Sequence, residues 1–254
     1  VIPLVHGLLR DGILQGWFFI RYEDPDHHLR LRFRGEPGHL WEKVLPRLHQ
    51  GLQAYMENGV LQRFQLDTFD REVERYGGPE AMPLVERLFE ADSSAALQTL
   101  LVYQDDTLAE ARWRLALLGM DRLLSDMGFD LERKFRVATS ISLGFLREFR
   151  GEGWLDHMIA ARFREVRKSL DALLFEEPQF GDPLEPGHQI FQTRSRQVAP
   201  VFEELKALFL QGRLTCSPDD LAESLLHMHA NRILRSAHRA QEVVLYFYLK
   251  KLYE

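Results

Sequence analysis

Residues 16–22 read GWFFIRY and residues 28–34 read HLRLRFR, with the turn-forming residues EDPD between them. Within the first segment, residues 17–20 form an apolar aromatic run, which is typical of a buried strand. In the second segment Leu29, Leu31 and Phe33 alternate with arginine, which is the period-two pattern of a strand with one face in the core. The two segments therefore predict an antiparallel pair of strands near the start of the chain.

The segments that follow extend this strand pair into an α+β fold. Apolar residues recur at helical spacing from Leu40 to Glu57, and Asn58-Gly59 is a typical helix end. Residues 61–68 alternate again and predict a third strand. The order strand, strand, helix, strand predicts an antiparallel sheet with helices of ferredoxin-like character.

Beyond residue 79 the sequence is mainly helical in pattern. Helical spacing predicts helices at residues 80–103, 106–127, 130–149, 153–174, 198–211, 219–236 and 238–253. Residues 176–187 contain three prolines and two glycines and predict a loop. We expect one compact domain over residues 1–254, with a sheet-containing part at 1–79 and a mainly helical part at 80–254.

The composition is that of a globular protein, with 45% hydrophobic and 28% charged residues among 254. A formal net charge of −6 argues against broad nucleic-acid binding, which needs a basic face. No apolar run reaches the roughly 18–20 residues of a membrane span, and the first residues lack the basic start of a signal peptide.

Cys216 is the single cysteine, so no intramolecular disulfide can form, which fits a cytoplasmic location. It lies at a predicted helix start, where the pKa of a thiol can fall, but we interpret it as an incidental cysteine. The sequence has no phosphate-cradling glycine loop and no GxGxxG, GxSxG or HExxH motif.

The first basic motif lies on the predicted second strand. Residues two apart on a strand face the same side, so His28, Arg30 and Arg32 share one face. Arginine binds carboxylates through a planar fork of donors. Neighbouring arginines repel and need acidic partners or an anionic ligand, so the motif indicates either a solvated face paired with acidic residues or an anion site.

The second basic motif surrounds Arg71 and Arg75, which are four residues apart and would share a face if the segment were helical. Tyr76 and the pair Gly77-Gly78 follow directly. Two glycines indicate a tight backbone excursion, as is found close to a ligand. A charged surface helix with a glycine stop is the alternative.

The third motif lies on a helix that Ser217 and Pro218 are expected to begin as N-cap and first helical residue. His227 and Asn231 share a face of this helix between leucines. A partly desolvated histidine can act as a general base; a core histidine with one hydrogen bond is the alternative. His227 and His229 point in different directions, and neither they nor His27-His28 have zinc-site spacing, so we predict no metal.

The chain resembles the small C-terminal domain of class I lantibiotic dehydratases. The resemblance lies, in this order along the chain, in residues 16–22, 28–33, 72–78, 89–93 and 227–232. The same domain occurs as a separate protein in thiopeptide pathways. The resemblance covers nearly the whole chain, and the ordered set is more specific than any one of its segments.

The resemblance implies a step in the biosynthesis of a ribosomally made antibiotic peptide. In that family a large partner protein or domain uses glutamyl-tRNA to esterify serine or threonine of a precursor peptide. The small domain then eliminates glutamate and leaves dehydroalanine or dehydrobutyrine, without a metal or organic cofactor. We therefore expect a cytoplasmic lyase that needs the precursor peptide and a glutamylating partner, does not bind nucleic acid directly, and is compatible with a homodimer.

By resemblance, Arg32, Arg75 and His227 act in elimination, with the arginines binding the glutamyl group and His227 serving as acid and base or orienting the substrate. The residues expected to bind substrate or support the pocket are Arg30, Arg71, Tyr76, Asn231 and Arg232. The same fold also serves a formal [4+2] cycloaddition between two dehydroalanines, which builds the pyridine ring of thiopeptides. That reaction has no glutamate to bind, so the presence of the arginines and His227 favours elimination. A non-catalytic precursor-binding subunit is the third alternative.

Overall fold

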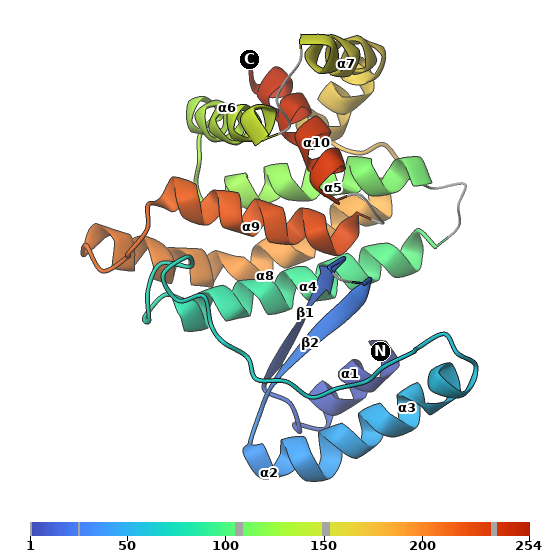
Figure 1. Ribbon diagram of the computed structural model, residues 1–254. Coiled ribbons are helices and arrows are strands. Elements are labelled where there is room, and N and C mark those ends of the chain that lie inside the picture. The colour runs from blue at the N-terminus through green and yellow to red at the C-terminus, as the bar shows by residue number, and fades with distance from the viewer. Residues whose placement is uncertain (1, 25, 105–108, 149–152, 235–237) are drawn as a thin grey trace. The chain divides into compact units, whose positions relative to one another are not determined.

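The computed structural model describes residues 2–24, 26–104, 109–148, 153–234 and 238–254 (Figure 1). The chain divides into two compact units, residues 1–72 and residues 73–254. The sequence predicted one compact domain that changes character at residue 79, whereas this division falls at residue 72. We call the two parts the N-terminal unit and the helical unit, and each is described by itself.

The N-terminal unit contains the predicted pair of strands. Strand β1 (Gly16–Tyr22) pairs antiparallel with β2 (His28–Arg34), and Gly16 lies opposite Arg34. Helix α1 (Ile2–Arg10) precedes them, where the sequence predicted no element. After β2, the predicted helix at 40–57 is found as α2 (Pro37–His39), a π-helical turn (Leu40–Val44) and α3 (Leu45–Glu57). The α+β class is therefore confirmed.

The predicted third strand is wrong, because residues 61–68 form neither strand nor helix. The apolar residues of this segment do not gather on a buried face, and Leu66 is 60% exposed. A strand also needs a neighbour for its backbone hydrogen bonds, and in the described part of the N-terminal unit β1 and β2 pair only with each other. The ferredoxin-like detail is therefore not found.

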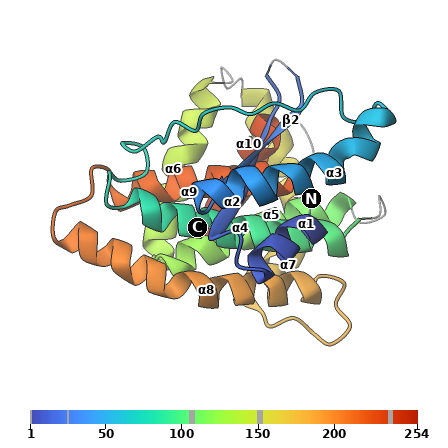
Figure 2. The same ribbon diagram turned by 90° about the horizontal axis from the view of Figure 1, so that it is seen from below.

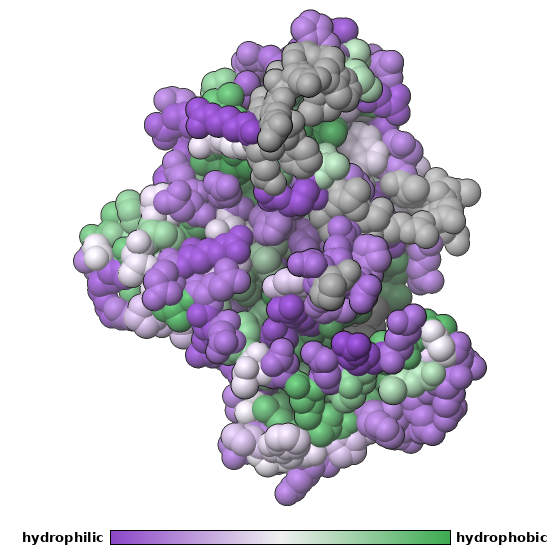
Figure 3. Space-filling model, viewed as in Figure 1, coloured by the Kyte–Doolittle hydropathy of each residue, from purple (hydrophilic) through white to green (hydrophobic). Residues whose placement is uncertain are grey.

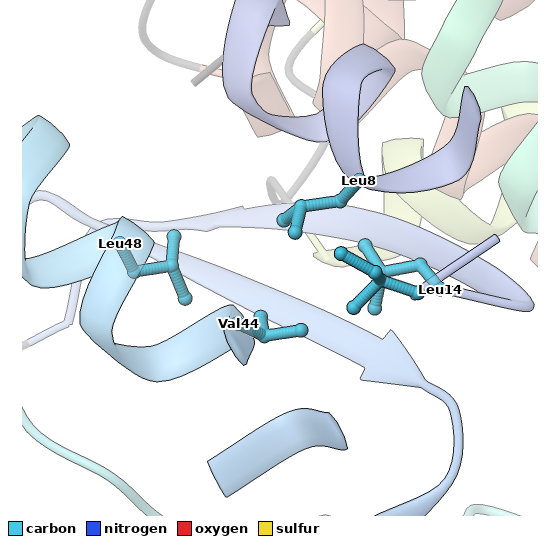
Figure 4. Packing of buried hydrophobic residues seen from close by; sticks show 5 residues of the cluster. Leu8, Leu14, Val44 and Leu48 are labelled. Carbon is cyan, nitrogen blue, oxygen red and sulfur yellow. The ribbon is translucent and has the colours of Figure 1, made fainter. Parts of the chain in front are cut away.

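A small apolar core holds the N-terminal unit together. Figure 4 shows Leu8, Leu14, Val44 and Leu48 pointing toward one another from α1, the segment after it and the α3 region. Leu31 and Phe33 of β2 pack against this cluster. Leu29 does not, since it is 56% exposed, so two of the three apolar residues predicted to face the core do so. Figure 3 shows hydrophobic surface over α1 and α3.

The helical unit contains each of the helices predicted after residue 79. They are α4 (Met82–Val102), α5 (Ala109–Asp126), α6 (Leu131–Glu148), α7 (Gly153–Phe175), α8 (Glu185–Leu210), α9 (Pro218–Ile233) and α10 (His238–Tyr253). Helix α8 begins at Glu185 rather than at residue 198, with Pro186 near its first position, where proline is favoured. The predicted loop at 176–187 is correspondingly shorter.

Four helices form the centre of this unit. Helices α4 and α5 each pack against both α8 and α9, and Figures 1 and 2 show these four running side by side. Helix α10 packs against α6, α7, α5 and α9. Among the described residues, every helix is too short or too polar to cross a membrane.

Candidate functional site

A polar pocket of about 270 Å³ lies within the helical unit. One wall is a face of α9, where Asp220, Glu223, Ser224 and His227 stand at helical spacing. The predicted N-cap is confirmed, because Ser217 Oγ accepts from the Asp220 backbone N–H at 3.1 Å and the Asp220 side chain bonds back. This reciprocal capping fixes the start of the wall.

The facing wall belongs to α10. Arg239, Glu242 and Tyr246 line the pocket and stand on one face of that helix at helical spacing. Ile141 and Phe145 of α6 add apolar surface. None of these residues was predicted from the sequence, although a glutamate directly before the apolar run at residues 243–249 is a signal that could have found Glu242.

His227 and Glu242 form a polar contact between the two walls. His227 Nδ1 lies 3.0 Å from each carboxylate oxygen of Glu242. The Glu242 side chain is 0% exposed and that of His227 is 28% exposed. An ionised carboxylate can only accept a hydrogen bond, so Nδ1 donates and Nε2 of the neutral ring is the nitrogen that can take a proton. The pair therefore has the arrangement of a general base and the group that orients it.

Arg75 reaches the pocket from the segment before α4. Its Nε donates to Ser224 Oγ at 3.3 Å, and its side chain lines the pocket. Residues 73–77 form turns rather than a helix, so the condition under which Arg71 and Arg75 would share a helix face is not met. Arg71 belongs to the N-terminal unit and is exposed.

The two glycines after Arg75 make the tight excursion that the sequence predicted. Gly77 and Gly78 have φ angles of +89° and +99°, which favour glycine. A Cβ on Gly78 would lie 2.9 Å from Thr215 Cγ2, and the Thr215 backbone N–H donates to the Gly77 carbonyl at 3.1 Å. The glycines thus approach the segment that leads into α9, and this contact fixes Arg75 beside that helix.

Three further residues proposed from the sequence lie in the core of the helical unit and are not among the residues that line the pocket. Tyr76 is 4% exposed and packs edge-on against Phe89, with ring centres 5.0 Å apart. Asn231 is 8% exposed and Arg232 is 1% exposed. These side chains therefore contact protein atoms in the core.

Arg232 takes part in a buried charged network around Asp92. Asp92 Oδ1 accepts from His229 Nδ1 at 2.7 Å and from Arg194 at 2.8 Å, while its Oδ2 accepts from Arg232 at 2.8 Å. Burial by itself would raise the pKa of Asp92, but His229, Arg232 and Arg194 hold that pKa well below its ordinary value. The network ties α9 to α4 and α8.

The same network fixes the rotation of α9 about its axis. His229 and Arg232 lie just beyond His227 on this helix, so their contacts with Asp92 determine which way His227 points. Gly119 of α5 lies against the imidazole of His229: a Cβ there would be 2.1 Å from His229 Nε2. Close packing of Gly119 against His229 therefore helps to hold α9, which forms one wall of the pocket, in place.

Burial of two histidines predicts that stability falls in mild acid. Desolvation lowers the pKa of His229 and of His188 below the ordinary value. The unfolded chain therefore takes up these protons first as pH drops through about 6.5. We expect the free energy of unfolding to fall by up to about 1.4 kcal/mol per pH unit for each histidine. Denaturation at several pH values measures this slope, and His188→Gln should remove about half of it; an unchanged slope in that variant would contradict the account.

The basic motif of the N-terminal unit is packed on aromatic rings. The guanidinium of Arg30 lies 3.8 Å from the ring centre of Tyr22, and that of Arg32 lies 4.9 Å from the ring centre of Phe69. Arg30 Nε donates to His28 Nε2 at 3.1 Å. Burial lowers the pKa of Arg32, and Arg30 adds to this effect. The predicted strand face shared by His28, Arg30 and Arg32 is confirmed. Cation–π contacts hold the two arginine side chains of this face.

Burial raises the pKa of the Cys216 thiol, which favours an incidental cysteine over a thiol activated by the helix start. In the described ranges, no group of three histidine, cysteine or acidic side chains is placed to hold a metal ion.

A family model described as "Lantibiotic biosynthesis dehydratase C-term" matches residues 1–253. The subtilin biosynthesis protein SpaB of Bacillus subtilis is 23% identical over 245 residues, which are 93% of this chain and 22% of that protein. The chain therefore spans about a fifth of the length of this curated relative. The family model and this relative each match nearly the whole of the chain.

Two solved structures share the fold. The tRNA-dependent lantibiotic dehydratase MibB from Microbispora sp. 107891 has a TM-score of 0.70 and 25% identity, with 98% of this chain and 26% of that chain covered. The pyridine synthase TbtD from thiomuracin biosynthesis has a TM-score of 0.64 and 16% identity, with 93% and 86% covered. The second likeness concerns the fold alone.

Proposed function

Since the chain belongs to the family of C-terminal domains of lantibiotic biosynthesis dehydratases, we propose that it eliminates glutamate from glutamylated serine or threonine of a precursor peptide. The product residue is dehydroalanine or dehydrobutyrine. The observation that carries the proposal is His227, held by the buried carboxylate of Glu242 in a pocket that Arg75 and Arg239 also line.

The reaction requires one proton transfer and one bond cleavage. His227 Nε2 takes the proton from Cα of the esterified residue, and the electron pair forms the Cα–Cβ double bond. The Cβ–O bond breaks, and its electron pair leaves on the carboxylate of glutamate. Glu242 stabilises the imidazolium that forms, because the buried carboxylate already accepts from Nδ1.

The charges of the pocket suit a glutamyl group, which carries both a carboxylate and an ammonium. Arg75 and Arg239 supply guanidinium groups, which bind carboxylates through paired donors. Glu223 supplies an acidic group for the ammonium. Asp220 also lines the pocket, although its carboxylate is engaged in capping α9. The pocket therefore offers both signs of charge to one small zwitterionic group.

The remaining residues keep roles that the family resemblance implies. Arg30, Arg32 and Arg71 belong to the N-terminal unit, and we assign Arg30 and Arg32 to binding of the glutamyl group, and Arg71 to binding of the substrate. Tyr76, Asn231 and Arg232 support the pocket from the core. Because the chain spans about a fifth of its curated relative, glutamylation of the peptide is assigned to another protein or domain.

Arg75→Ala is expected to lower kcat/KM for glutamate release about 10- to 100-fold, since a hydrogen bond to a charged group contributes about 1.5–3 kcal/mol. Arg75→Lys should restore only part of the loss, because lysine lacks the planar fork. Arg87→Ala is the matched control: Arg87 pairs with Glu204 on the surface and does not line the pocket. Steady-state kinetics of glutamate release measure all three, and an Arg75→Ala or Arg32→Ala rate equal to wild type would contradict the anion-binding role.

Mass spectrometry of a glutamylated precursor peptide incubated with the chain tests the proposal. Elimination converts the ester into a dehydro residue and releases free glutamate in equal amount. If the ester stays intact while a peptide with two dehydroalanines is cyclised, the chain is a pyridine-forming enzyme. If it binds the peptide without turnover, and His227→Ala makes no difference, it is a precursor-binding subunit.

A further inference from the structure

Tyr246 is a polar side chain of the pocket that the proposed mechanism does not use. It lines the same pocket as His227 and Glu242, and the residue is 0% exposed. Its Oη is buried and has no hydrogen-bond partner within the part of the chain that the structure describes. A buried polar group without a partner is destabilising, so this hydroxyl is a candidate for contact with a bound ligand.

The surroundings of Tyr246 keep its hydroxyl protonated and its ring fixed. Burial raises the pKa of this phenol well above its ordinary value, and Glu242 and Glu223 add to the effect. The group is therefore a hydrogen-bond donor at neutral pH. The ring packs on Phe145, with ring centres 5.4 Å apart, so the position of the hydroxyl is fixed by packing rather than by a hydrogen bond of its own.

We propose that the Tyr246 hydroxyl donates a hydrogen bond to the leaving carboxylate of the glutamyl group. The inference rests on the proposed function and extends it, because Arg75 and Arg239 supply guanidinium groups for a carboxylate in the same pocket and a carboxylate can only accept. Negative charge grows on this oxygen as the Cβ–O bond breaks, and a fixed donor at that place favours the transition state. Tyr246 thereby directly contacts the substrate, while Glu242 acts through His227.

Tyr246→Phe tests the inference because it removes one oxygen atom and keeps the ring against Phe145. We expect kcat for elimination to fall about tenfold or more, and the affinity for free glutamate to fall by a similar factor, as is typical of a lost hydrogen bond to a charged group. The melting temperature should stay the same or rise, since no hydrogen bond to a described residue is lost.

Tyr253→Phe is the matched control. Tyr253 is also buried on α10, but its hydroxyl donates to Asp121 at 2.8 Å and does not line the pocket. This variant should melt at a lower temperature than wild type and retain its rate of elimination and its affinity for glutamate.

Thermal melting in the presence of free glutamate separates failure of this inference from failure of the proposed function. If wild type does not eliminate glutamate but is stabilised by it more than Tyr246→Phe is, the hydroxyl contact stands and the proposed reaction is wrong. If wild type eliminates and Tyr246→Phe matches it in both rate and glutamate affinity, the inference is overturned. It is also overturned if Tyr246→Phe fails to fold or melts at a lower temperature than wild type, because the hydroxyl then has a structural partner.

Discussion

The His227→Asn variant is expected to release glutamate about 10²- to 10⁴-fold more slowly than the wild-type chain, which is the usual contribution of a positioned general base. The asparagine amide can replace Nδ1 as the donor to Glu242, which accepts from that nitrogen at 3.0 Å. It cannot replace Nε2 as the atom that takes the proton. Single-turnover release of glutamate from a saturating amount of protein measures the loss without interference from product release.

Two companion variants separate proton transfer from folding. Glu242→Gln removes the carboxylate that orients His227 and should give a rate between those of wild type and His227→Asn. His49→Asn changes an exposed histidine of the N-terminal unit and should leave the rate unchanged. If His227→Asn melts at the wild-type temperature and still eliminates at the wild-type rate, another group removes the proton.

Asp92→Ala is expected to destabilise the chain by about 3–5 kcal/mol, because removal of one member of a buried ion pair leaves uncompensated charge. Arg194 and Arg232 have side chains that are 0% and 1% exposed, and both bond to Asp92 at 2.8 Å. His229 would lose its partner as well. The free energy of unfolding, obtained from denaturant titration at pH 7, measures the effect.

Glu204→Ala is the control for this prediction. It also removes an arginine–carboxylate pair, but Arg87 and Glu204 are 42% and 53% exposed, so the expected cost is about 0–1 kcal/mol. Equal losses in the two variants would show that the buried network contributes no more than a surface pair does. That result would also contradict the view that the network fixes the rotation of α9.

Local sequence signals were sufficient for the elements that carry the predicted motifs. The alternation of leucine and arginine in β2 identified both its pairing and its arginine face, and Ser217 with Pro218 identified the start of α9. Arg75 and His227 were proposed for one site, and the structure brings them into the same pocket. The predictions for β2 and α9 depend on spacing within a short segment, which a single sequence records, whereas the grouping of Arg75 with His227 came from the family resemblance.

The features that the sequence did not reveal depend on contacts between distant segments. The alternation at residues 61–68 resembles a strand, but no neighbouring strand in the described structure pairs with it. The partner of His227 lies fifteen residues away on another helix, and nothing within α9 indicates which acidic residue it is. Arg232 shares a local motif with His227, yet Asp92, which is 140 residues away in sequence, holds it in the core.

The account is tested most directly by measuring, in one incubation, the free glutamate and the dehydro residue formed from a glutamylated precursor peptide by wild type and by His227→Asn. We predict that wild type forms the two products in equal amounts and that His227→Asn, folded to the same extent, forms neither at a comparable rate. An ester that stays intact with wild type, or equal rates in both proteins, would contradict the assignment of elimination to the pocket of His227 and Glu242.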